Sequence, residues 1–96
     1  MSWQAVAWAN EQPTGSPSAH LVLVQLASIA EADGVVRRLD IPWLVRVSKQ
    51  SRPSVFRRLR EFERAGWSMR ERVGSASDGS PLVLVRLHLN GKWARP

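Results

Sequence analysis

Apolar and polar positions follow helical spacing through most of the chain and strand spacing near its end. The stretch from Pro17 to Ala32 is apolar almost all round, which predicts a helix that is covered on more than one side. Its β-branched residues are also compatible with a strand, but the length of the stretch favours a helix. Ser16 is expected to cap this helix, and Asp33-Gly34 is expected to stop it.

Two shorter amphipathic stretches follow, and they predict a pair of helices separated by a tight turn. The first runs from Asp40, its cap, to Val47 with Pro42 in its first turn, and the turn is Ser48-Lys49-Gln50. The second runs from Ser51, its cap, to Ala65, and Gly66 ends it. The apolar side chains of this second helix cluster on one narrow stripe, formed by Val55, Leu59 and Phe62.

The end of the chain is rich in residues that favour strands. Trp67 to Val73 and Leu82 to Leu89 alternate in polarity, and residues 74–81 between them are rich in Gly, Ser and Asp, which predicts a β-hairpin. A short strand is also expected from Val35 to Leu39, and a short amphipathic helix from Met1 to Asn10. The expected apolar face of that N-terminal helix consists of Trp3, Val6 and Ala7, with Trp8 beside them.

Positive charge is concentrated in the second part of the chain. The formal net charge is +6, and all 14 lysine and arginine residues lie at or after Arg37, whereas Glu11, Glu31 and Asp33 precede it. An acidic part beside a basic part suggests a face that binds a polyanion. Arginine far outnumbers lysine, which suits phosphate and guanine because the guanidinium makes paired hydrogen bonds. Genomic base composition is the competing explanation for that excess.

The helix from Ser51 to Ala65 presents arginine opposite its apolar stripe. An α-helix fits the major groove of B-DNA, and the N-terminal half of a recognition helix usually reaches the bases. The competing interpretation is that Arg57 with Glu61, and Arg60 with Glu63, form ordinary surface ion pairs. The side chains expected at the bases are Gln50, Ser51, Arg52, Pro53, Ser54 and Arg57, and those expected at phosphates are Arg58, Arg60 and Arg64.

The predicted hairpin offers a second contact with DNA. Arg70 and Arg72 share one strand face, and Arg86 lies on the partner strand. The glycines and serines of the loop would let its backbone approach phosphates closely. Arg37 or Arg38 would hold the flanking backbone. The alternative is an ordinary flexible turn with scattered charge.

Residues Ser16 to Trp67 resemble the helix-turn-helix domain of phage and plasmid replication initiators and related DNA-binding regulators. The matching stretches are SPSAHLVLVQLASIAEADG and LVRVSKQSRPSVFRRLREFERAGW. The resemblance implies an α+β winged helix-turn-helix fold, with a three-helix core and a C-terminal β-hairpin wing, that binds double-stranded DNA at a replication origin or an operator. The family usually has a glycine near Lys49, an apolar residue near Gln50 and a polar residue at Phe56. We favour packing of Phe56 on another part of the chain over contact with a thymine methyl group.

The expected organisation is an N-terminal arm over residues 1–15, a winged-helix domain over residues 16–90, and a tail over residues 91–96 that is either a true end or the start of a longer protein. Trp3 and Trp8 of the arm need apolar cover. The cover is either the helix from Pro17 in the same molecule or that helix of a second copy in a homodimer, which would read paired half-sites.

Several functions are not expected from this sequence. It has no Cys and no HExxH, CxxC or P-loop pattern, so we expect neither an enzyme nor a metal or other cofactor. No apolar run is as long as a membrane helix and no secretory signal is evident, so the default location is the cytoplasm. RNA is disfavoured because no strand carries stacking aromatic residues. The competing function is a protein-interaction module with Phe56 and Trp93 as its contact anchors.

Overall fold

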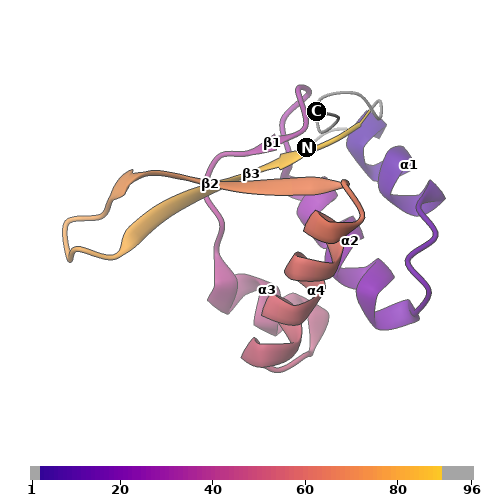
Figure 1. Cartoon of the computed structure of the whole chain (residues 1–96), viewed down its shortest axis with the longest axis horizontal. Coiled ribbons are helices and arrows are strands. Elements are labelled where there is room, and N and C mark those ends of the chain that lie inside the picture. The colour runs from indigo at the N-terminus through magenta and orange to yellow at the C-terminus, as the bar shows by residue number, and fades with distance from the viewer. Residues whose placement is uncertain (1–2, 90–96) are drawn as a thin grey trace.

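The computed structural model describes residues 3–89, in which four helices pack beside a three-stranded antiparallel sheet with strand order β1-β3-β2 (Figure 1). This confirms the expected α+β class and is compatible with a winged-helix-like arrangement. The elements are α1 (Trp3–Glu11), α2 (Pro17–Ile29), β1 (Val35–Val36), α3 (Ile41–Ser48), α4 (Arg52–Arg64), β2 (Ser68–Ser75) and β3 (Pro81–Leu87).

The helices α2, α3 and α4 begin where the sequence predicts, each at a capping side chain with a proline in the first turn. A cap of this kind satisfies a backbone N–H that has no partner inside the helix, and it contributes about 1 kcal/mol. The backbone N–H groups of Ala19, Trp43 and Ser54 donate to Ser16, Asp40 and Ser51 at 3.1, 3.0 and 3.2 Å.

The first long helix is shorter than predicted, because α2 ends at Ile29 and not at Ala32. Ala30 already has extended backbone angles. The next residues form a tight connection in which the Glu31 N–H donates to the Val35 carbonyl at 3.0 Å. The strand β1 begins at Val35 as predicted but is only two residues long, whereas the predicted strand ran on to Leu39.

The predicted apolar face of the N-terminal helix is wrong at Trp3 and Ala7, which are exposed, whereas Val6 packs against the core as predicted. Ala5 and Ala9 are the buried residues of α1, and Trp3 is 81% exposed. Small side chains let α1 approach α2 closely, whereas a tryptophan between the two helices would hold them apart. Trp8 is half-buried against the core, so it finds its cover within the same molecule. The segment expected as an arm therefore contributes to the same core as the rest of the chain.

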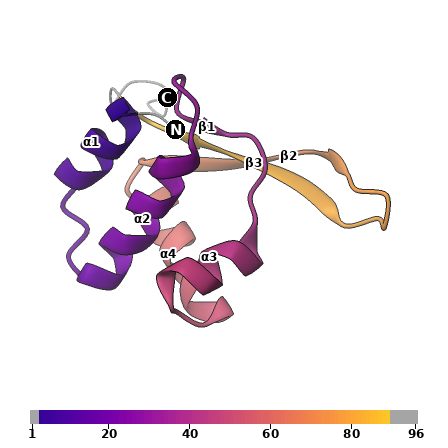
Figure 2. The ribbon, with the colours of Figure 1, turned by 180° about the vertical axis from the view of Figure 1, so that it is seen from behind.

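The strands β2 and β3 form the predicted hairpin, which projects well beyond the helices (Figures 1 and 2). Their observed bounds are Ser68–Ser75 and Pro81–Leu87, in place of Trp67 to Val73 and Leu82 to Leu89. The register shifts between Arg72 and Gly74, where a bulge adds a residue to β2. Only the part of the hairpin next to the body is buried, so its outer part is supported by strand pairing alone.

Candidate nucleic-acid interface

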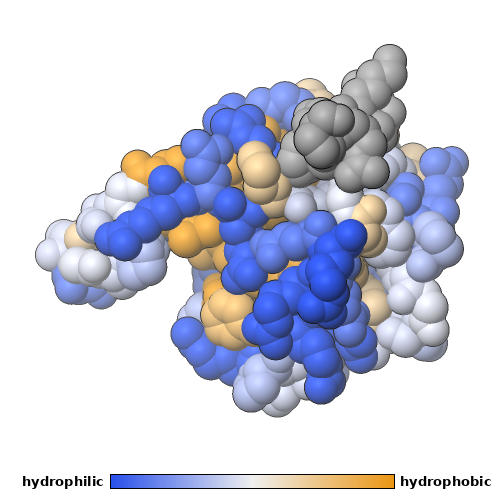
Figure 3. All heavy atoms as spheres, viewed as in Figure 1, coloured by the Kyte–Doolittle hydropathy of each residue, from blue (hydrophilic) through white to orange (hydrophobic). Residues whose placement is uncertain are grey.

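The apolar stripe of α4 is buried as predicted, and the opposite side carries arginine in solvent. Val55, Leu59 and Phe62 are between 0% and 1% exposed. Figure 3 shows hydrophilic side chains covering the surface above α4. We call the exposed residues Arg52, Arg57, Arg60 and Arg64 the α4 arginine face.

The two glutamates of α4 do not neutralise this face. Glu61 pairs with Arg58, with Oε1 and Nη1 at 3.0 Å, and Glu63 pairs with Arg70 of β2. The surface pairs considered from the sequence, Arg57 with Glu61 and Arg60 with Glu63, are therefore wrong. Within residues 3–89 no member of the α4 arginine face has an ion-pair partner.

The polar residues at the start of α4 bond mainly to one another. The Ser51 hydroxyl caps the helix and donates to Oγ of Ser54 at 2.9 Å. Nη2 of Arg57 reaches the same Ser54 oxygen at 3.4 Å, a long and weak contact. Pro53 is exposed beside them. The Arg57 guanidinium thus stays beside the N-terminal half of α4, and no carboxylate neutralises its charge.

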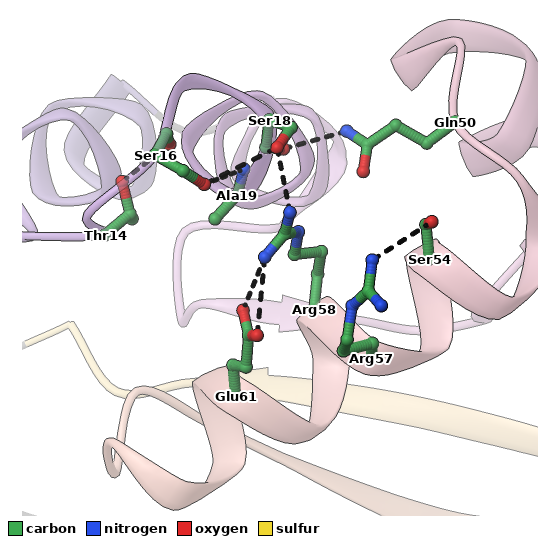
Figure 4. Close-up of polar contacts among 9 residues, drawn as sticks. All are labelled: Thr14, Ser16, Ser18, Ala19, Gln50, Ser54, Arg57, Arg58 and Glu61. Atoms are coloured by element: carbon green, nitrogen blue, oxygen red, sulfur yellow. Dashed lines mark hydrogen bonds and ion pairs between the residues drawn. The ribbon is translucent and has the colours of Figure 1, made fainter.

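Two predicted DNA contacts, Gln50 and Arg58, turn toward the body of the protein (Figure 4). Nε2 of Gln50 donates to the Ser18 carbonyl at 2.9 Å, and Nη2 of Arg58 donates to Oγ of Ser18 at the same distance. The Arg58 side chain is only 19% exposed and also binds Glu61. Both residues therefore fasten α4 and the preceding turn to the first turn of α2.

Arg70 also points inward, from β2 toward α4. Its Nη2 lies 3.1 Å from Oε1 of Glu63, and both side chains are 28% exposed. The guanidinium carbons of Arg70 and Arg52 lie 6.0 and 5.4 Å from the centre of the Phe56 ring, within cation–π range. Phe56 itself is half-buried and packs against the core, in agreement with the expectation of packing.

The hairpin carries its positive charge on its two strands rather than in the loop at its tip. Arg72 is exposed and donates to Oγ of Ser75 at 3.0 Å, while Arg86 pairs with Glu71 at 3.3 Å. At the tip, the Ser80 hydroxyl and backbone N–H donate to the Asp78 carboxylate and lower the pKa of that group. Asp78 therefore stays ionised at neutral pH, and the tip presents a negative charge.

A groove lies between the hairpin and the N-terminal ends of α3 and α4, and it is visible as a hollow in Figure 3. It has a volume of about 870 Å³ and combines an apolar floor with arginine side chains. Arg38 lines this hairpin groove, whereas Arg37 pairs with Glu31 and Asp33 at 3.1 and 3.2 Å. The lining includes Arg38, Arg52, Arg70 and Arg72, the carboxylates Asp40 and Glu71, and the apolar residues Phe56, Pro42, Pro81 and Val83.

The hairpin groove could not be found from the sequence. Its walls come from three segments that are far apart in the chain, around residues 38–42, 52–56 and 70–83. No sequence pattern within any one of these segments indicates that the other two lie beside it. The sequence indicated only single residues of it, since Arg38, Arg52, Arg70 and Arg72 were each expected to contact DNA.

The part of the chain that the structure describes shows neither a metal-ligating cluster nor a membrane-spanning helix. Residues 3–89 contain no cluster of three or more metal-ligating side chains. None of the helices there has the length and apolar character needed to span a membrane. Trp93, one of the two proposed protein-contact anchors, and the expected tail over residues 91–96 lie outside the described residues.

Comparison with known proteins returned no match among protein-family models, among curated proteins or among solved structures. The function of the chain therefore has to be argued from the geometry of the site.

Proposed function

We propose that this chain is a winged-helix protein that binds double-stranded DNA in a sequence-specific manner. The observation that carries the proposal is the α4 arginine face, which is exposed, has no acidic partner within residues 3–89, and sits on a helix whose other side is fully buried. A polypeptide helix of about 10–12 Å diameter fits the major groove of B-DNA, which is about 12 Å wide. The helix would present Arg57, Arg60 and Arg64 toward that groove, while Arg52 lies over the Phe56 ring at the edge of the hairpin groove.

Arg57 is the best candidate for reading a base. It lies in the N-terminal half of α4, and its one intramolecular bond, to Ser54, is long. A guanidinium that is not already paired can bind O6 and N7 of guanine without first losing a strong partner. Arg60 and Arg64 follow one and two turns later, where phosphates of the flanking backbone would lie.

The hairpin groove is proposed to accept the phosphate backbone beside the major groove. Arg38 and Arg72 both line it, and neither forms an ion pair with a carboxylate within residues 3–89, although the positive charge of Arg38 also acts on Asp78. The ionised Asp78 would repel phosphates at the hairpin tip. We therefore expect the strands of the hairpin, and not the loop at its tip, to touch DNA.

The resemblance of residues 16–67 to phage and plasmid initiators points to a replication origin or an operator as the biological target. Selection of duplexes from a random pool with the full chain would define the preferred sequence. A single preferred half-site or an inverted repeat supports specific recognition. A pool that stays random after selection contradicts it.

Alanine substitution tests the assigned face. Arg57→Ala should weaken binding to the selected duplex by roughly 5- to 150-fold, corresponding to about 1–3 kcal/mol, and should relax the preference at one base pair. Arg37→Ala is the matched control, since it removes the same charge from an ion pair with Glu31 and Asp33 away from the groove. Equal losses for Arg37→Ala and Arg57→Ala in fluorescence anisotropy would show that only net charge matters.

The salt dependence separates a backbone contact from a base contact. Arg72→Ala should weaken the selected and a scrambled duplex alike, and the slope of log K against log salt should fall by about 0.9. Arg57→Ala should affect the selected duplex more than the scrambled one. A binding constant that hardly changes with salt would instead favour the protein-interaction module.

A further inference from the structure

The outer surface of the α1–α2 pair has a protruding tryptophan at one end and a hollow at the other. Trp3 and Asn10 are seven residues apart, about two helical turns, so they share one stripe of α1. Oδ1 of Asn10 lies 2.9 Å from Nε2 of His20, which places the end of α1 beside the start of α2. The two helices therefore run antiparallel, with Trp3 at the end far from His20.

The protruding side chain is unusual in its exposure. Trp3 is 81% exposed, the largest value among the exposed large apolar residues of the described chain. A tryptophan buries roughly 150–250 Å² when it is covered, so an exposed tryptophan does not make this large apolar contribution to stability. Nothing within residues 3–89 covers it, and Ala5 and Ala9 take the place toward α2 that a larger side chain would otherwise fill.

The hollow at the opposite end is uncharged and partly apolar. It has a volume of about 560 Å³, within the range of about 300–1,000 Å³ that holds small ligands in proteins. Leu21, which is 37% exposed, and the half-buried Val24 form its apolar wall. The other lining residues are Asn10, Thr14, Ser16, Pro17 and His20.

Charge on this surface favours a second copy of the chain over an oppositely charged partner. The helices α1 and α2 contain one formally charged residue, Glu11, although the chain carries a net charge of +6. Two copies that approach through these helices bring no row of arginines together. They keep their basic surfaces apart, as like charges require.

We propose that two copies associate through a twofold axis across the α1–α2 surface, with Trp3 of each copy inserted into the hollow beside Leu21 of the other. A twofold interface has to be self-complementary, and a projection and a hollow at opposite ends of one surface meet that condition. Figure 2 shows α1 and α2 at one end of the molecule and the hairpin projecting at the other. Association at that end leaves the hairpin and its groove uncovered.

The expected affinity is modest. Two tryptophans together bury roughly 300–500 Å², and the side chains that cover them bury a similar area, so the total stays below the about 1,200–2,000 Å² of stable complexes and in the range of weak ones. We expect a dissociation constant in the micromolar range. The proposal concerns the protein without DNA, so it stands or falls independently of the proposed DNA binding.

Sedimentation equilibrium of the full chain without DNA tests the dimer over micromolar to millimolar concentrations. Trp3→Ala and Leu21→Glu should each raise the dissociation constant at least about tenfold, because one removes the projection and the other puts a charge in the hollow. Val73→Ala is the control, since it removes an exposed apolar side chain of the hairpin, 52% exposed, and should leave the constant unchanged. Far-ultraviolet circular dichroism shows whether each variant keeps its helices, and Trp3→Gln replaces Trp3→Ala if that variant does not.

Mixing the two defective variants gives the sharper result. A pair formed by Trp3→Ala and Leu21→Glu regains one of the two contacts, from the intact tryptophan of one copy to the intact hollow of the other. The mixture should therefore dimerise more strongly than either variant alone. A monomeric wild-type chain at millimolar concentration, or a mixture no stronger than its components, overturns the proposal.

Discussion

Arg57 and Arg58 are neighbours in the sequence and have opposite surroundings. Arg57 is exposed with one long contact to Ser54, whereas Arg58 is 19% exposed and bonded to both Ser18 and Glu61. One step along a helix turns a side chain through about a quarter of a circle, so adjacent arginines of α4 can have a binding and a structural role. The same chemical group therefore contributes to stability at one position and is available to a ligand at the next.

This difference predicts separate effects on folding and binding. Arg58→Ala should lower the free energy of unfolding by about 1–3 kcal/mol, because it removes a charge-assisted bond from α4 to Ser18 of α2 and an ion pair with Glu61 within α4. Arg60→Ala should change it by less than about 0.5 kcal/mol, while it weakens DNA binding. Urea unfolding followed by circular dichroism measures the first quantity, and equal destabilisation by both substitutions would contradict the assignment.

At the scale of elements, the turn between α3 and α4 sets the direction in which α4 faces. Lys49 ends α3 in the left-handed conformation, with φ 58° and ψ 33°, and its N–H donates to the Val45 carbonyl at 3.1 Å. The family resembled by the sequence usually has a glycine near this position, and the backbone shows why. An L-residue in this conformation is strained by about 1–2 kcal/mol, whereas glycine adopts it without a steric cost.

The effect of a substitution at Lys49 on stability should therefore depend on backbone conformation and not on charge. Lys49→Gly and Lys49→Ala remove the same positive charge, but only glycine relieves the strain. We expect Lys49→Gly to be the more stable of the two by about 1 kcal/mol in urea unfolding. Equal stabilities would mean that the turn does not hold this conformation in solution.

At the scale of the whole molecule, the segment that leads from α2 into β1 is crowded against β3 at Gly34. Gly34 has φ +82°, and its carbonyl accepts from the Leu87 N–H at 2.8 Å. A Cβ at Gly34 would lie 2.8 Å from the Leu87 carbonyl oxygen, which is closer than van der Waals contact allows. This close approach holds the β1 region against β3, and so places the hairpin relative to α4.

Gly34→Ala should therefore destabilise the protein beyond the cost of its backbone angle. Gly15 is the matched control, because it has the same φ of +82° and nothing within 4 Å of the position of a Cβ. Gly15→Ala should cost about 1 kcal/mol or more, and Gly34→Ala about 1–3 kcal/mol in addition. Thermal unfolding of the two variants measures the difference, and similar melting temperatures would contradict a close contact at Gly34.

The sequence by itself determined the elements and the polarity of α4. Ser16, Asp40 and Ser51 are local signals, since a capping side chain acts on a backbone N–H only three residues away. The apolar stripe of α4 depends only on helical spacing, and so does the arginine on its opposite side. The α+β class follows from these helices and from the alternation that predicts the hairpin.

Only the tertiary structure decided which polar side chains form hydrogen bonds within the protein and which face of α1 is buried. Gln50 and Arg58 bond to Ser18, and Arg70 bonds to Glu63, through contacts between elements that no spacing in the sequence indicates. Alanine, and not tryptophan, faces α2 because the distance between the two helices rewards a small side chain. The hairpin groove likewise exists only where three distant segments meet, since hydrogen bonds and packing across elements depend on distances in space.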